Sequence, residues 1–150
     1  MCAIVKKITV ADIMRLLSAP YGILFIMKGV IIGMKIHKIA ELLEATVLCG
    51  ENNLDGEVFS ACGCDMMSDV LAFVKEQAVL ITGLCNPQVV RTAEMMDMRC
   101  IVFVRGKMPP QEVITLADDA GIVLLATSYR MYVACGKLYE NGLSGGSVVK

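Results

Sequence analysis

Histidine and the aromatic residues are scarce in this sequence of 150 residues. It has one histidine and no tryptophan, and aromatic residues make up 5% of the chain. His37 lies in a predicted helix without a nearby acid pair, so the sequence offers no histidine base for a catalytic triad. The motifs G-x-x-x-x-G-K-[ST], G-x-S-x-G and H-E-x-x-H are also absent. We therefore expect a protein that is not an enzyme.

An excess of charge of one sign is missing as well. The chain has 14 Lys and Arg against 15 Asp and Glu, which gives a formal net charge of −1. Binding to nucleic acid depends on clustered basic side chains that meet the phosphates, and no basic stripe occurs here. Nucleic acid is therefore excluded as an expected partner.

No hydrophobic run reaches the roughly 20 apolar residues that a membrane-spanning helix needs. The most apolar stretch, residues 21–33, is short and contains Lys28 and three glycines. We expect it to be a buried element and expect no membrane partner. The complete domain pattern begins at Met34, which predicts that Met34 is the natural start and that residues 1–33 are an N-terminal extension.

Seven cysteines are present, but they do not predict a disulfide framework. Their number is odd, and no secretory cleavage pattern precedes them, which indicates a reducing cytoplasm. The C-x-C pair formed by Cys62 and Cys64 does not have the spacing of a known metal or iron–sulfur motif. We expect no metal and no cofactor, and we interpret most cysteines as small buried hydrophobic residues.

Apolar residues make up 56% of the chain, and most are aliphatic, as in sheets that are covered on both faces. The pattern predicts strands at residues 46–49, 56–61, 78–82, 100–104 and 122–126. It predicts helices from Met34, from the cap Asp65 to Gln77, from the cap Asn86 to Asp97, from Pro110 to Ala120, and from Ser128 or Tyr129 to Asn141. Alternating strands and helices predict an α/β fold, a three-layer α/β/α sandwich with a largely parallel sheet. Residues 144–150 are predicted to be a mobile tail.

Candidate ligand-binding residues follow the strands, because α/β sheets bind ligands beyond the carboxyl ends of their strands. Glycines there permit close backbone approach, helix starts offer free N–H groups, and basic side chains complement an anion. The candidate residues are Asp65, Gly83, Asn86, Arg105, Gly106, Lys107, Thr127 and Ser128. The alternative is that these glycines and cap residues serve ordinary strand-to-helix turns.

Three stretches resemble a known family. They are residues 63–70 (GCDMMSDV), residues 81–83 with 91–94 (ITG and RTAE), and residues 101–106 with 110–113 (IVFVRG and PQEV). They are similar to the DRTGG domain, which is related to the N-terminal domain of HPr kinase/phosphorylase, and residues 127–131 (TSYRM) resemble its final strand-to-helix junction. Residues 104–107 (VRGK) stand where the family has a Thr-Gly-Gly turn. The resemblance covers about residues 34–143.

The resemblance implies an α/β domain that accompanies catalytic or nucleotide-sensing domains and contributes to oligomer contacts. We therefore expect a stand-alone regulatory or accessory module without kinase chemistry, which binds a nucleotide or another small anionic effector. We also expect a homo-oligomer, with a redox enzyme or a metabolic enzyme as partner. The alternative function is an enzyme of unfamiliar type that acts on a phosphorylated metabolite.

Overall fold

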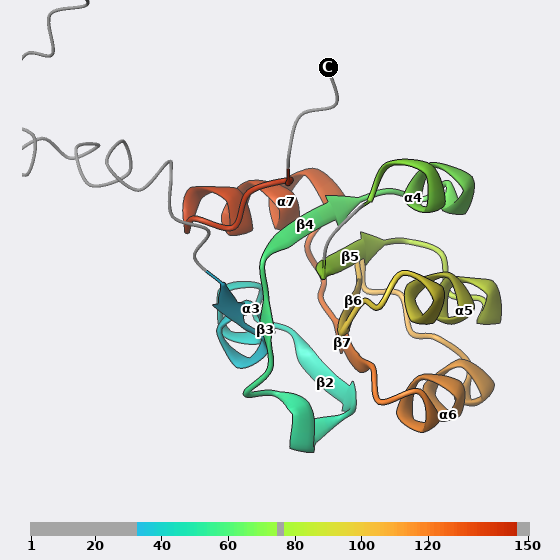
Figure 1. The fold of residues 1–150 in the computed structure, drawn as a ribbon. Helices are drawn as coiled ribbons and strands as arrows, with labels where there is room; N and C mark the ends of the chain where they lie inside the picture. The colour runs from blue at the N-terminus through green and yellow to red at the C-terminus, as the bar shows by residue number, and fades with distance from the viewer. Residues whose placement is uncertain (1–32, 75–76, 147–150) are drawn as a thin grey trace, which may run out of the picture. The chain divides into compact units, whose positions relative to one another are not determined.

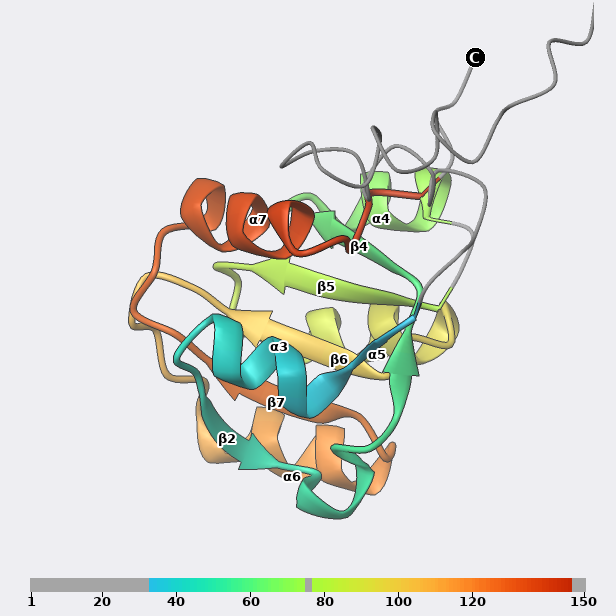
Figure 2. The same cartoon turned by 90° about the vertical axis from the view of Figure 1, so that its left-hand side faces the viewer.

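The computed structural model describes residues 33–74 and 77–146, and five of its strands form one sheet (Figures 1 and 2). The strands are β2 (Thr46–Cys49), β4 (Ser60–Gly63), β5 (Ala78–Thr82), β6 (Cys100–Phe103) and β7 (Val123–Ala126). Their order across the sheet is β2-β7-β6-β5-β4. The last four strands are parallel, and β2 runs antiparallel to β7. The predicted largely parallel sheet is confirmed.

Helices cover both faces of this sheet (Figure 1). Helices α4 (Met67–Phe73), α5 (Pro87–Met95) and α6 (Gln111–Asp119) lie on one face, and α3 (Ile36–Leu42) and α7 (Met131–Glu140) lie on the other. Successive strand residues alternate between the two faces. Val79 and Ile81 belong to the core shared with α3 and α7, whereas Leu80 belongs to the opposite core. The predicted three-layer α/β/α sandwich is confirmed.

The predicted strand at residues 56–61 is wrong as a single element. It is divided into β3 (Glu57–Val58), which pairs antiparallel with β1 (Met34–Lys35), and β4, which joins the main sheet. The break lies at Phe59, whose N–H donates to the Gln77 carbonyl. Because β1 takes the first two residues of the predicted opening helix, α3 begins at Ile36.

The predicted cap at Asp65 is also wrong. Helix α4 begins after Met66 without a side-chain cap, and its last residue is Phe73, followed by the extended residue Val74. Asp65 makes long-range hydrogen bonds instead, and these compete with a local cap. The cap at Asn86 is confirmed, because its side chain accepts a hydrogen bond from the Val89 N–H.

The two predicted terminal segments lie largely outside the described residues. Of residues 1–33, the structure describes Gly33, so it does not test the predicted extension. At the other end, the Ser144 carbonyl accepts a hydrogen bond from the Ala61 N–H at 2.9 Å, and residues 147–150 are outside the described part. None of the helices in the described ranges is long and apolar enough to span a bilayer.

Candidate functional site

Five residues meet beyond the carboxyl ends of β4, β5 and β6, and we call them the carboxyl-end cluster: Asp65, Thr82, Gly83, Arg105 and Lys107. The Asp65 carboxylate accepts three hydrogen bonds. They come from the Gly83 N–H at 2.7 Å, the Thr82 hydroxyl at 3.0 Å and the Arg105 guanidinium at 2.6 Å. Because parallel strands end at one edge of the sheet, side chains that are 17 to 40 positions apart in sequence become neighbours.

The turn at residues 104–107 positions the Arg105 side chain. Arg105 and Gly106 have φ angles of +69° and +65°, the pattern of a type I′ turn, and Lys107 N–H donates to the Val104 carbonyl at 3.4 Å. A left-handed conformation costs a non-glycine residue about 1–2 kcal/mol. The N–H groups of Arg105 and Gly106 donate to the carbonyls that follow β7, at 2.8 and 2.9 Å. These bonds hold the strained turn in place.

Gly83 lies under both basic side chains. The Lys107 ammonium donates to the Gly83 carbonyl at 2.7 Å. A Cβ built on Gly83 would coincide with the Arg105 guanidinium, so the guanidinium occupies the space that any larger residue would need. The absence of a side chain at position 83 therefore allows Arg105 to reach Asp65 across the end of β5.

The carboxyl group of Asp65 titrates below its ordinary range. Burial raises its pKa, but the hydrogen bonds from the Gly83 N–H, Arg105 and Thr82, together with the charge of Arg105, outweigh burial and lower the pKa overall. Asp65 is therefore an anion at neutral pH, and it neutralises one of the two cations at this edge.

The connections after β6 and β7 diverge at the same place. The four parallel strands follow one another without a reversal of order, so the sheet lacks the usual switch point at which α/β folds bind ligands. The connection after β6 nevertheless leads to α6 on one face, whereas the connection after β7 leads to α7 on the other (Figure 1). The turn at residues 104–107 lies at this divergence.

Three of the other four predicted site residues have roles within the fold. Asn86 caps α5, and Thr127 is buried with its hydroxyl donating to the Leu43 carbonyl at 2.7 Å. Gly106 completes the turn, and Ser128 is exposed. The structure thus joins Asp65, Gly83, Arg105 and Lys107 through direct contacts, while Asn86 and Thr127 use their side chains within the fold.

Two residues near this edge were not among the predicted site residues. Thr82 donates to Asp65, and it also accepts from the Leu84 N–H at 3.2 Å. The Tyr129 backbone carbonyl accepts a hydrogen bond from the Arg105 N–H, and the Tyr129 hydroxyl donates to the Glu44 carboxylate at 2.6 Å. A threonine directly before glycine at the end of a buried strand is a usable signal for Thr82. The long-range contacts of Tyr129 have no local sequence signal.

The cysteines do not form a metal centre in the part of the chain that the structure describes, where no three or more His, Cys, Asp or Glu side chains are arranged for one. Burial raises the pKa of Cys62 to about 11, with smaller contributions from nearby Cys64 and Cys135. Burial also raises the pKa of Cys100, which lies in β6. Both thiols are protonated at neutral pH and are poor nucleophiles.

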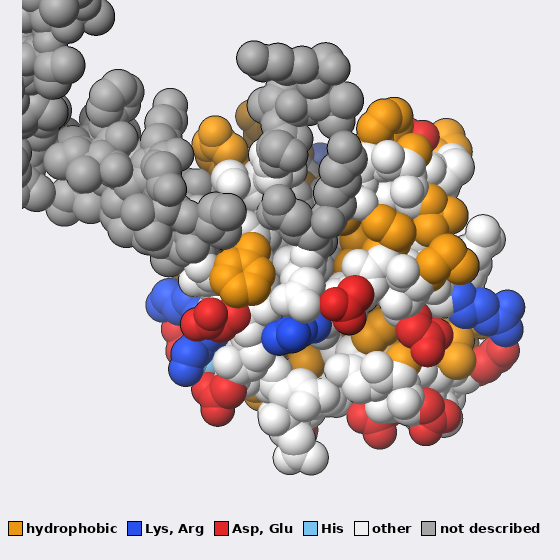
Figure 3. Space-filling view, viewed as in Figure 1, with side chains coloured by type: hydrophobic (Ala, Val, Ile, Leu, Met, Phe, Trp, Pro, Cys, Tyr) orange, Lys and Arg blue, Asp and Glu red, His pale blue; other side chains and the backbone are white. Residues whose placement is uncertain are grey.

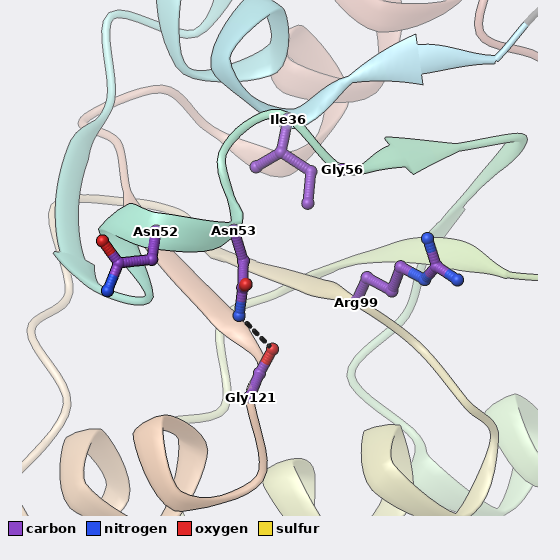
Figure 4. Close-up of a pocket in the computed structure, with 6 residues that line it drawn as sticks. All are labelled: Ile36, Asn52, Asn53, Gly56, Arg99 and Gly121. Carbon is purple, nitrogen blue, oxygen red and sulfur yellow. Dashed lines mark hydrogen bonds between the residues drawn. The ribbon is translucent and has the colours of Figure 1, made fainter.

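A hollow of about 310 Å³ lies at the opposite end of the sheet (Figure 4). We call it the amino-end pocket, and its lining residues are Ile36, Asn52, Asn53, Gly56, Arg99 and Gly121. The Asn53 amide donates to the Gly121 carbonyl at 3.1 Å, which ties the 3-10 helix η2 (Glu51–Asn53) to the connection between α6 and β7. This pocket was not predicted, because its residues come from four turns or element ends without a shared motif.

Comparison with known proteins connects this fold to a family. No match was found among curated proteins. Among solved structures, the chain is similar to the CBS and DRTGG domains of the regulatory region of the Clostridium perfringens pyrophosphatase, complexed with its activator diadenosine tetraphosphate. The TM-score is 0.59 at 16% identity, and the match covers 77% of this chain but 52% of that one, so this chain spans about half of its relative. The DRTGG domain model matches residues 38–140, and the chain therefore belongs to the DRTGG domain family.

Proposed function

We propose that this protein is a stand-alone regulatory or accessory module of the cytoplasm that binds a small anionic, nucleotide-like effector. Its DRTGG domain, predicted to span residues 34–143, performs no kinase chemistry and no other catalysis in this proposal. Family membership supports a regulatory role. The similar pyrophosphatase region binds diadenosine tetraphosphate, which supports a nucleotide as the effector class.

The observation that carries the proposal is the convergence of two basic side chains on Gly83. Lys107 and Arg105 both reach back over the end of β5, although each would gain hydration by extending into solvent. Asp65 neutralises Arg105, but no ion pair of Lys107 occurs among the described residues. One positive charge is therefore left beside the Gly83 carbonyl at the end of β5, where it attracts an anion.

A thermal-shift screen with nucleotides and sugar phosphates tests this function. A ligand at 100 times its dissociation constant stabilises the folded state by about 2.7 kcal/mol, which gives a clear rise in melting temperature. Turnover of a stabilising compound would favour the alternative enzyme function instead.

The substitution Arg105→Ala then tests the location. It removes a charged hydrogen bond, typically worth about 1.5–3 kcal/mol, so the affinity for an identified effector should fall by about 10- to 150-fold. Arg99→Ala, at the other end of β6, is the matched control and should leave the affinity unchanged. Unchanged affinity in Arg105→Ala would rule out the carboxyl-end cluster as the effector site.

We further propose that the module is a homo-oligomer and acts on a redox or metabolic enzyme. Support comes from exposed apolar side chains, with Leu71, Phe73 and Met95 exposed by 43%, 60% and 75%. Figure 3 shows hydrophobic side chains gathered over α4 and α5, and exposed apolar patches of this kind mark interfaces. Sedimentation should detect a dimer or larger species at micromolar concentration, and Phe73→Asp should shift it toward the monomer.

A further inference from the structure

Building on the proposed effector site, we infer that Asp65 competes with every anion and Lys107 meets the second charge of a dianion, so that the site selects a terminal phosphate monoester, a group that the diadenosine tetraphosphate of the similar pyrophosphatase region lacks. The Asp65 carboxylate already occupies the Gly83 N–H, the Thr82 hydroxyl and the Arg105 guanidinium. These are the donors that a bound anion would use. An effector must therefore displace this carboxylate or share its donors.

The ion pair between Arg105 and Asp65 can open to admit another anion. The side chains of Arg105 and Asp65 are 43% and 42% exposed, so neither is locked in the interior. Ion pairs with this exposure contribute little to stability and are readily broken. The guanidinium also has five N–H donors, so it retains donors for a second acceptor after one has bonded to Asp65.

The charge of the incoming anion determines whether it can displace the Asp65 carboxylate. A carboxylate or a phosphodiester carries one negative charge, so replacing Asp65 by either group gains no Coulomb energy at the guanidinium. A phosphate monoester carries close to two charges above its second pKa of about 6. Its second charge attracts the Lys107 ammonium, which now bonds only to the neutral Gly83 carbonyl among the described residues. The site therefore favours a monoester over a diester.

Matched nucleotides test this selectivity in titration calorimetry of the full chain at about pH 7.5. AMP has a terminal monoester, and cyclic AMP presents the same base and sugar with a diester. The wild type should bind AMP at least about tenfold more tightly, which corresponds to one charged hydrogen bond. Asp65→Asn removes the competing charge, so both nucleotides should bind about tenfold more tightly while AMP stays preferred. Lys107→Gln removes the charge that meets the second phosphate charge, so the preference should shrink to about threefold or less.

Asp69→Asn is the control, because Asp69 is an exposed acidic residue on α4 that is not part of the cluster, and it should retain the wild-type affinities for both nucleotides. Should Asp65→Asn fold poorly, the wild type alone provides a second measurement. Its affinity for AMP should fall as the pH drops below about 6, where the phosphate gains a proton.

The outcomes separate this inference from the proposed function. If the wild type binds both nucleotides equally, if Lys107→Gln keeps the full preference, or if Asp65→Asn binds neither nucleotide more tightly, the inference is wrong and the effector site still stands. If neither nucleotide binds to the wild type or to any of the variants, the proposed nucleotide effector is itself wrong.

Discussion

The two ends of the sheet differ in how they hold their arginine side chains. At the carboxyl end, Arg105 is bonded to Asp65 and its backbone is held in a left-handed turn. At the amino end, Arg99 lines a hollow of about 310 Å³, and no carboxylate pairs with it among the described residues. These arginines flank the same strand, β6. The difference shows that the connecting turns, not the strand, determine whether a basic side chain is organised or free.

The amino-end pocket and the carboxyl-end cluster therefore lie at opposite ends of the sheet. The amino-end pocket has space, but the one side-chain hydrogen bond between its described lining residues runs from the Asn53 amide to the Gly121 carbonyl. The carboxyl-end cluster has four hydrogen bonds between its members and a strained turn, and strained backbone accompanies binding sites. Arrangement of charge, rather than volume, is the reason to place the effector at the carboxyl end.

Phe103→Ala should produce the largest loss in the free energy of unfolding, and this loss should affect both ends of the sheet together. Phe103 is fully buried at the end of β6, and truncating a buried phenylalanine costs about 3–5 kcal/mol. Urea unfolding should show this loss. Phe73→Ala, the same change at a side chain that is 60% exposed, should cost less than about 0.5 kcal/mol. Equal losses would contradict the assignment of Phe103 to the core.

Gly83→Ala should impair the carboxyl end alone. The new Cβ would displace the Arg105 guanidinium, which is the movable end of a flexible side chain, so unfolding free energy should change by less than about 1 kcal/mol. Affinity for the effector should nevertheless fall by about tenfold. Gly136→Ala is the control, because its Cβ would enter open space in α7. Full affinity in Gly83→Ala would show that Arg105 does not need its present position.

The pH dependence of stability should identify Asp65 as part of the organised end. Because the folded state lowers its pKa, Asp65 stabilises the protein above its ordinary pKa of about 3.9, and this contribution is lost as the pH falls through the lower folded value. The contribution of so exposed a pair is below about 1 kcal/mol. Wild type should therefore be more stable than Asp65→Asn at neutral pH, and the difference should shrink as the pH falls below the ordinary pKa of Asp65. A constant difference would exclude this role.

Asn53→Ala should have the smallest effect, and it concerns the amino end. It removes the exposed hydrogen bond to the Gly121 carbonyl, which contributes about 0.5 kcal/mol. Effector affinity should not change, because the pocket is at the other end of the sheet. A clear loss of affinity would instead indicate that the amino-end pocket takes part in binding.

The central strands could be predicted because their signals are local. Residues 78–82 form β5 as predicted, and β6 and β7 each lack one residue of the predicted range. Continuous aliphatic runs bounded by turn residues are enough to identify buried strands. The break at Phe59 could not be predicted in the same way, because it depends on pairing with β1 and with the chain before β5.

The candidate site was predictable as a location but not as a set of contacts. The topology places Asp65, Gly83, Arg105 and Lys107 at one edge, as the strand order implies. The role of Asp65 was missed, because a polar residue shortly before a helix has the same local signature whether it caps the helix or bonds elsewhere. The left-handed turn at Arg105 was missed as well, since arginine is not a residue that favours a positive φ.

Amide NMR of the ¹⁵N-labelled chain, titrated with AMP, tests the central claim most directly. The two ends have separate reporters, because Asp65, Gly83 and Lys107 belong to one and Asn53, Gly56 and Gly121 to the other. We predict saturable shifts at Asp65, Gly83 and Lys107, which Arg105→Gln abolishes and Arg99→Gln does not. Shifts confined to Asn53, Gly56 and Gly121, and lost in Arg99→Gln, would contradict the account and place the effector in the amino-end pocket.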